Sequence, residues 1–501
     1  MPRLHPSLLV CSLIITCSAF AAAEDAPASA DAEQPVSYYR QVRPILQRHC
    51  SGCHQAAKKG GELLLTSYEG FQTGGTLGPA FTPGKPEESA VIQYVSGEEP
   101  LMPLNAEPLD LQQIETIARW ITEGAKDDTP PMAQDTITAE NPPSYARPPV
   151  ITALAYSPDS TLLAVSGFHE ILVHEADGSG LAARLVGRAQ RINALAFSPD
   201  GTILAAVGGT PALFGEVQFW DVQQKKLLAS ETVSFDTLFG ASFSDDGTMF
   251  AFGGADNRAY VYRLKRTEAG ELEIERAMRF DAHADWVLGT TFSLKLDHLI
   301  TVSRDMSMKL VIIENAQFVD NITSITPGAL KGGLMAVERH PKKEQVLTAG
   351  SDGTPNLYKI FRTRKRIIGD NFNHIRGYGE MPGRIFDLEF NADGSLFVAG
   401  SSTATDGAAR IYKTGEYDET TINNEGGLQE TYRQTEARSK VDALVHDLPV
   451  DTPVYSVAFR PDGAQVALGG FDGQVRLFDV QSGSLVTEFL PVELTEATAA
   501  K

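Results

Sequence analysis

Apolar residues recur at helical spacing in two stretches between residues 36 and 128. The first stripe consists of Tyr39, Val42, Ile45 and Leu46, a spacing that places them on one helix face. The second begins after Asp110, which with Gln113 resembles a capping box. Its expected buried face is Leu111, Ile114, Ile117, Trp120 and Ile121, and Gly124 is expected to end the helix. The pattern predicts a small all-α domain over residues 36–128.

A different pattern fills residues 148–490. An apolar strand ends in an aromatic residue, a turn of the Ser-Pro-Asp-Gly type follows, and a second apolar strand ends in small residues. Copies are centred on Tyr156, Phe197, Phe243, Phe292, Arg339, Phe390 and Phe459, with successive gaps of 41, 46, 49, 47, 51 and 69 residues. A period of ~40–45 residues is typical of propeller blades, and longer gaps imply loop insertions. We expect an all-β propeller of seven blades, and the degenerate fourth and fifth copies leave six or eight open.

Some strands in this region end on a Trp-Asp-like pair, Trp220-Asp221 and Phe478-Asp479. The region therefore resembles a WD-repeat β-propeller. That resemblance implies a structural role for His283, with Asp305 as its turn partner; a metal or cofactor ligand is the alternative. Leu485 to Phe489 is a candidate for the last outer strand.

The sequence Cys50-Ser51-Gly52-Cys53-His54 carries the sharpest chemical signal. The spacing C-x-x-C-H is the attachment signature of c-type haem, in which the thiols of Cys50 and Cys53 form thioethers and His54 binds the iron. A redox disulfide or half of a zinc site fits less well, because a histidine follows directly and no second cysteine pair is present. We expect one covalent haem c.

Met102, in Pro100-Leu101-Met102-Pro103, is the candidate for the distal iron ligand. Prolines on both sides restrict the loop, although methionine is more often core filler. A His/Met haem has no open coordination site and passes electrons. The Pro79 carbonyl is a candidate acceptor for the second imidazole nitrogen of His54, with a plain turn as the alternative. Met132 lies in the Pro-rich linker.

These motifs occur in one order across residues 36–128, together with Val42-Arg43-Pro44-Ile45-Leu46, Gly60-Gly61, Gly74-Gly75, Gly78-Pro79, Pro83-Gly84-Lys85-Pro86 and Trp120-Ile121. The segment resembles the planctomycete-type cytochrome c domain. The resemblance implies haem binding by Cys50, Cys53 and His54, and distal ligation by Met102. Leu104 departs from the family, which often has a second proline there.

The N-terminus has the features of a secretory signal peptide over residues 1–23. Arg3 precedes an apolar run from Leu8 to Phe20, and Ala21-Ala22-Ala23 fits a cleavage site. Cys17 leaves a lipid anchor open, but Thr16 is an awkward residue before a lipidated cysteine. Cleavage leaves only Cys50 and Cys53 in the mature chain, so no structural disulfide is expected. No later stretch reaches the ~20 apolar residues of a membrane span, and we expect a periplasmic or otherwise extracytoplasmic protein.

The remaining segments are a linker at 24–35, a Pro-rich spacer at 129–147, a polar, acid-rich insertion at 414–450 and a tail at 491–501. The chain carries 43 Lys and Arg against 64 Asp and Glu, a net charge of −21. This charge disfavours nucleic acid and anionic membranes as partners. One basic stretch, at 359–384, is either a solvated outer strand or a docking face; it contains Lys359, Arg362, Arg364, Lys365, Arg366, Arg376 and Arg384.

The features together predict an exported electron-transfer protein whose propeller docks a redox partner or acts as a scaffold. We expect no enzymatic activity, because no nucleophile elbow, phosphate loop or paired carboxylates stand out. One alternative is an oxidoreductase whose propeller binds a second cofactor or substrate and passes electrons to the haem. A second alternative is a haem-based sensor on a propeller scaffold.

Overall fold

The computed structural model describes residues 35–55, 58–104, 107–130, 137–268, 270–324, 330–363, 365–366, 371–415 and 443–495, with Lys58 and Lys59 described by their backbone alone. The expected signal peptide with Cys17, Met132, Arg364 and most of the insertion at 414–450 lie outside these residues. The helices and the sheets belong to one compact unit, Val36–Lys501.

The described residues of the helical region (36–128) form the α-helices α1 (Arg43–His49), α2 (Tyr68–Thr73), α3 (Ala90–Val95) and α4 (Leu111–Thr122). A π-helical turn, η1 (Tyr38–Val42), precedes α1, and two 3-10 turns are η2 (Gly60–Glu62) and η3 (Pro86–Glu88). The core is aromatic. Trp120 stacks on Phe71 at 5.9 Å between ring centroids and meets Phe81 edge-on at 4.9 Å. The region is not purely helical, because β1 (His54–Gln55) pairs with β2 (Lys58–Lys59).

Both expected helices are present. Val42 and Leu46 of the first stripe are fully buried. In α4, the Asp110 carboxylate accepts from the Gln113 N–H at 2.8 Å while the Gln113 side chain accepts from the Asp110 N–H at 3.1 Å, which completes the capping box. The expectation that Leu111 is buried is wrong: its side chain is 78% exposed. Leu111 is the first helical residue, and the buried face of α4 begins further along the helix, at Ile117.

The rest of the described chain is a β region made of antiparallel sheets. The first sheet contains β3 (Leu154–Tyr156), β4 (Leu162–Ser166), β5 (Phe168–Glu175), β6 (Leu181–Phe197), β7 (Ile203–Thr210), β8 (Phe214–Asp221) and β9 (Lys226–Ser234). Two four-stranded sheets follow: β10 (Leu238–Phe243), β11 (Met249–Gly254), β12 (Ala259–Arg266) and β13 (Leu272–Phe280); then β14 (Val287–Phe292), β15 (His298–Ser303), β16 (Met308–Ile312) and β17 (Gln317–Asn321).

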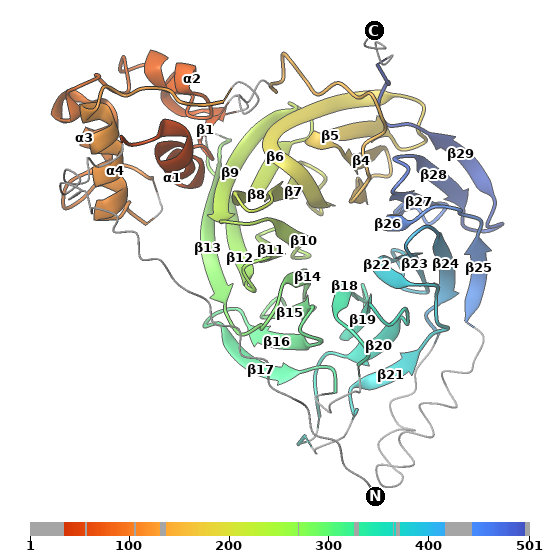
Figure 1. Cartoon of the computed structure of the whole chain (residues 1–501). Coiled ribbons are helices and arrows are strands. Elements are labelled where there is room, and N and C mark those ends of the chain that lie inside the picture. Colours follow the sequence, from red (N-terminus) through yellow and green to blue (C-terminus); the bar gives the residue numbers. More distant parts are fainter. Residues whose placement is uncertain are drawn as a thin grey trace, which may run out of the picture. The chain divides into compact units, whose positions relative to one another are not determined.

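The last three sheets are also four-stranded. They comprise β18 (Leu334–Arg339), β19 (Gln345–Gly350), β20 (Asn356–Lys359) and β21 (His374–Gly377); β22 (Arg384–Phe390), β23 (Leu396–Ser402), β24 (Gly407–Lys413) and β25 (Leu444–Leu448); and β26 (Val454–Phe459), β27 (Gln465–Gly470), β28 (Val475–Asp479) and β29 (Leu485–Phe489). Within each sheet, neighbouring strands follow one another along the chain. Figure 1 shows the sheets arranged around a common centre, with the first strand of each four-stranded sheet innermost.

All seven expected turns join the strands of antiparallel hairpins. The hairpins are β3–β4, β6–β7, β10–β11, β14–β15, β18–β19, β22–β23 and β26–β27. The first sheet holds two repeats because β6 is long: Leu181–Val186 pairs with β5, and Ile192–Phe197 pairs with β7.

Local polar contacts stabilise the turns. The Ser198 hydroxyl donates to the Asp200 carboxylate at 2.5 Å and accepts from the Ile203 N–H at 2.9 Å, and Gly201 supplies the left-handed residue with a φ of 71°. His283 has the structural role expected of it. Its ring lies 2.9 Å from the Asp305 carboxylate and 2.7 Å from the Thr301 hydroxyl.

The first and last sheets are neighbours. The N–H of Ile151 donates to the Gly470 carbonyl, and the N–H of Leu154 donates to the Ser456 hydroxyl, both at 2.9 Å. The expected outer strand at Leu485 to Phe489 is present as β29, paired with β28. Hydrogen bonds between the chain's distant ends therefore link the sheets into a ring.

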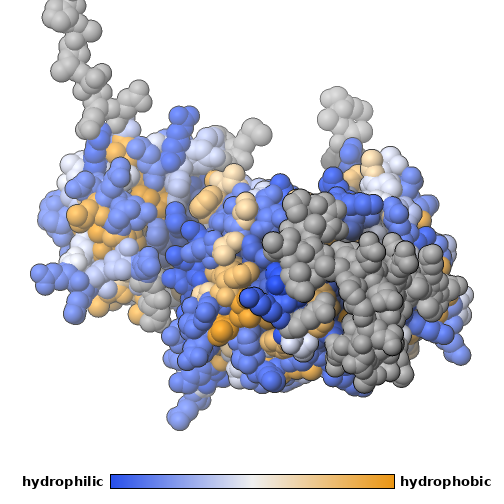
Figure 2. Space-filling view, turned by 90° about the horizontal axis from the view of Figure 1, so that it is seen from below, coloured by the Kyte–Doolittle hydropathy of each residue, from blue (hydrophilic) through white to orange (hydrophobic). Residues whose placement is uncertain are grey.

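The face drawn in Figure 2 is mostly hydrophilic, with hydrophobic patches between the polar residues. Exposed apolar side chains of the helical region include Leu77, Leu101, Leu104 and Leu111. Across the part of the chain that the structure describes, no helix has the length and apolar character needed to cross a bilayer.

Candidate haem-binding site

Residues 50–54 form a tight turn that directly follows α1. The N–H of Cys50 bonds to the Leu46 carbonyl at 2.9 Å, and the N–H groups of Cys53 and His54 both bond to the Cys50 carbonyl at 3.2 Å. Two thiols and an imidazole are thus held on a few residues of constrained backbone. Both cysteines are free; Cys50 is half-buried and Cys53 is exposed.

The environment of the His54 side chain suits a metal ligand. It is half-buried, and its Nδ1 is buried without a hydrogen-bond partner among the residues described. Burial lowers the pKa of the imidazole, which favours the neutral ring that binds iron. Gly60 lies against the ring, where a Cβ would come within 3.4 Å of Cε1. The donor set and the unpartnered nitrogen fit a covalently attached haem.

The Cys50 thiol lies in a mixed environment. Burial and the neighbouring Cys53 raise its pKa to about 12, while the positive charge of Arg188 acts in the opposite direction. Cys50 packs against the aromatic core of the helical region. The uncharged thiol therefore sits between an apolar core and a buried cation.

Met102 reaches the same core from the other end of the region. Its N–H bonds to the Tyr94 carbonyl in α3 at 2.9 Å, and its side chain packs against the cluster that Cys50 also contacts. Its neighbours Leu101 and Leu104 are 65% and 70% exposed. The loop therefore turns Met102 inward while Leu101 and Leu104 face outward. Ligation of the iron by Met102 stays a prediction.

Pro79 follows a tight turn in which the N–H of Gly75 bonds to the Gly78 carbonyl at 3.0 Å. A Cβ on Gly74 would lie 2.7 Å from the Pro79 Cα, so Gly74 permits the close approach. In the described segments no hydrogen bond joins Pro79 to His54. The role of the Pro79 carbonyl as an acceptor stays a prediction.

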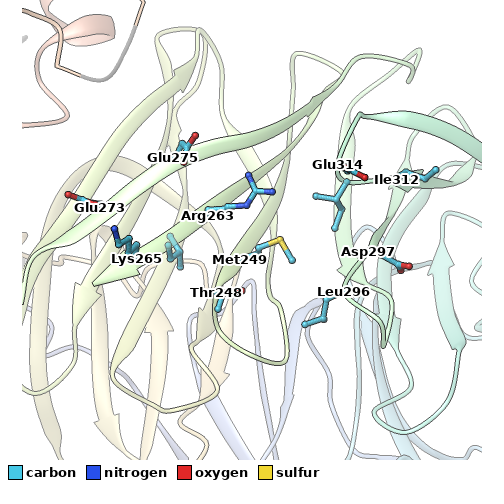
Figure 3. Close-up of a pocket in the computed structure, with 12 residues that line it drawn as sticks. Thr248, Met249, Arg263, Lys265, Glu273, Glu275, Leu296, Asp297, Ile312 and Glu314 are labelled. Atoms are coloured by element: carbon cyan, nitrogen blue, oxygen red, sulfur yellow. The ribbon is translucent and has the colours of Figure 1, made fainter. Parts of the chain in front are cut away.

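Besides the haem motif, the chain carries a groove and a basic stretch in its β region. A groove of about 680 Å³ lies between the sheets β10–β13 and β14–β17. Figure 3 shows that it is lined by side chains of mixed charge, among them Arg263, Lys265, Glu275 and Glu314. Opposite charges placed side by side favour no single class of ligand.

The basic stretch at 359–384 is partly neutralised within the chain. Asp320 pairs with Arg362 at 3.1 Å and with Arg366 at 2.8 Å, and Lys359 is buried over the Phe372 ring. Lys365 and Arg384 remain exposed. Docking at this stretch stays a prediction that rests on fewer charges than the sequence suggests.

The structure also adds residues that the sequence analysis did not name. They belong to the first sheet and lie beside the haem motif. Arg188 and Thr232 hydrogen-bond to the Gln47 carbonyl, and Glu216 pairs with Arg188. All three lie more than 130 residues from the haem motif in sequence, and no local pattern marks them.

Both the helical region and the β region contain a segment that matches a known protein family. Residues 50–103 match the family model described as planctomycete cytochrome c, and residues 443–479 match the WD domain, G-beta repeat. The two matches support a chain that joins a planctomycete-type cytochrome c domain to a region with a WD repeat. No curated protein matches the chain. The cytochrome c domain indicates a haem cofactor, and the WD repeat indicates a module for protein interaction.

Proposed function

We propose that this protein is an electron carrier with one covalent haem c, attached through Cys50 and Cys53. His54 would bind the iron on one side and Met102 on the other. The turn that holds two free thiols beside a half-buried imidazole, whose buried Nδ1 has no hydrogen-bond partner among the described residues, is the observation that carries the proposal. When bound, the haem supplies reversible one-electron chemistry. The protein's residues favour the neutral imidazole and pack Met102 against the core that Cys50 also contacts.

We further propose that the ring of sheets is a seven-bladed propeller, with the long strand β6 shared between the first two blades. This count agrees with seven hairpins and with the bonds between the first and last sheets. In this proposal the propeller docks a redox partner, and the expected signal peptide over residues 1–23 directs the protein out of the cytoplasm. Tethering a haem domain to a docking module raises the effective concentration of the pair.

The test is the visible spectrum of the full mature chain, made with haem maturation and recorded oxidised and reduced. One low-spin haem c per chain, retained after denaturation and unreactive with carbon monoxide, supports the carrier. A Cys50→Ala/Cys53→Ala variant should lose the covalent haem. A second chromophore would favour the oxidoreductase, a high-spin haem that binds carbon monoxide would favour the sensor, and a chain without haem would refute the proposal.

A further inference from the structure

The second repeat of the β region, β6–β9, contacts both flanks of the haem motif. The Gln47 carbonyl, three residues before Cys50, accepts from Arg188 Nη1 at 2.9 Å and from the Thr232 hydroxyl at 3.1 Å. On the other flank, Gln55 Nε2 donates to Glu216 Oε1 at 3.3 Å. The segment that carries the haem ligands is therefore bonded to the repeat on either side.

The contact is also close at the middle of the motif. A Cβ on Gly52 would lie 2.9 Å from the Ser230 carbonyl oxygen of β9. Any side chain at position 52 would push the two backbones apart. Gly52, one of the two variable residues in C-x-x-C-H, is thus needed by the repeat rather than by the haem chemistry.

The charged groups at this contact are shielded from water. Arg188 is 6% exposed and Glu216 is fully buried, with 3.7 Å between Nε and Oε1. Glu216 also accepts from the Ser230 hydroxyl at 2.5 Å and from Gln218 at 2.8 Å, and the Arg188 guanidinium lies over the Phe214 ring at 3.9 Å. Charges in such an environment act more strongly on their neighbours than surface charges do.

We infer that β6–β9 forms part of the haem site and that Arg188 and Glu216 set the reduction potential of the haem with opposite sign. The inference rests on the proposed haem attachment. Ferric haem carries one more positive charge than ferrous haem, so a buried cation beside the attachment segment favours the ferrous form and raises the potential. A buried carboxylate does the reverse. The reduction potential of the haem therefore depends on Arg188 and Glu216 of the β region as well as on the helical region.

Spectroelectrochemical titration of the haem-loaded full chain tests the inference with two variants of opposite expected effect. Arg188→Met should lower the potential because it removes the cation and leaves the carboxylate. Glu216→Gln should raise it because it leaves the cation unopposed. Arg188→Lys keeps the charge and should restore most of the potential that Arg188→Met loses.

The matched control is Arg184→Met. Arg184 pairs with buried Glu170 at 2.6 Å and bonds to the Pro143 carbonyl. It is also an arginine paired with a buried carboxylate, although its own side chain is 30% exposed, and it lies against the linker rather than the haem motif. We expect its potential to equal that of the wild type. This control separates an effect at the haem from the general cost of breaking a buried pair.

Three outcomes would overturn the inference: no shift in either variant, shifts of the same sign, or an equal shift in Arg184→Met. Shifts of the same sign accompanied by lower unfolding temperatures would show that the pair only holds the domains together. A wild-type chain without a low-spin haem would instead contradict the proposed function. The spectrum of the wild type thus tests the proposed haem, and the potentials of the variants test the role of Arg188 and Glu216.

Discussion

Met102 is the residue on which the proposed six-coordinate iron depends. Met102→Ala removes the thioether and leaves the two cysteines and His54 in place. We expect the haem to stay covalently bound, to become high-spin and to titrate at a lower potential, because thioether ligation favours ferrous iron. Visible spectra and a redox titration measure both changes.

The control for this variant is Met249→Ala, since Met249 is a half-buried methionine of β11 in the β region. Its spectrum should match the wild type. If Met102→Ala kept a low-spin spectrum with an unchanged methionine-to-iron band, the distal ligand would be another residue.

The raised pKa of Glu338 leads us to expect that the stability of the β region depends on pH. Burial raises its pKa to about 8, with Asp387 and Asp245 raising it further and Arg339 opposing them; burial raises the pKa of Asp387 to about 6. Since the folded pKa of Glu338 exceeds its ordinary value of 4.5, its contribution is fully present below that value and is lost as pH rises through about 8. We expect the unfolding temperature to fall between pH 5 and pH 8.5.

Glu338→Gln should flatten that slope, because the amide does not ionise. Glu275→Gln, at an exposed position of β13, is the comparison and should leave the slope as it is. Scanning calorimetry at a series of pH values gives the result. Equal slopes in wild type and Glu338→Gln would assign the pH dependence to other groups, such as Glu389, whose pKa is also raised by burial.

At the scale of elements, the sequence predicts best where the cause is local. The seven hairpins follow from turns whose Ser, Asp and Gly residues bond to one another within a few positions, as at Ser198, Asp200 and Gly201. Helix α4 follows from its own cap. Leu111 was mispredicted because periodicity gives the face of a helix but not the point along it where the core begins.

The cap of α4 should be measurable in stability. Asp110→Ala removes the carboxylate that accepts from the Gln113 N–H, and losing such a cap costs about 1 kcal/mol. Denaturant unfolding followed at the haem absorbance reports this region specifically. Glu115→Ala, at an exposed position of the same helix, should change the free energy of unfolding by less than about 0.5 kcal/mol.

A loss in Glu115→Ala as large as that in Asp110→Ala would mean that the helix responds to any lost charge. An unchanged midpoint in Asp110→Ala would mean that solvent replaces the cap. Either result would mean that the capping box is present in the structure but does not itself stabilise the helix by the expected amount.

At the scale of the whole molecule, local rules no longer suffice. The motif Cys50–His54 points to candidate haem ligands by itself, but Arg188 lies 141 residues from its partner Gln47. Thr232 and Glu216 are still more remote, at 185 and 161 residues from their partners Gln47 and Gln55, and each is an ordinary strand residue in the sequence. Only the folded ring brings them to the haem motif, so the sequence indicates candidate ligands but not the residues that surround them.

The net charge of the whole chain acts on a redox partner at longer range than any single contact. The chain carries −21, and Glu98 and Glu99, both exposed, precede Met102 in its loop. Long-range attraction therefore favours a cationic partner and weakens as salt screens it over a Debye length of ~10 Å at 0.1 M. The rate of reduction by hexaammineruthenium(II), a small cation, should fall with ionic strength, whereas the rate of oxidation by ferricyanide, an anion, should rise.

The double variant Glu98→Gln/Glu99→Gln tests whether that attraction is focused at the Met102 loop. It should weaken the salt dependence of the hexaammineruthenium reaction more than Glu273→Gln/Glu275→Gln, which removes the same charge from β13 at two exposed positions. Stopped-flow rates at several salt concentrations give the slopes. Equal slopes in the two variants would show that electrons enter elsewhere on the surface; a steeper loss at the loop would place the entry point beside Met102 and make a basic face the feature to seek in the partner.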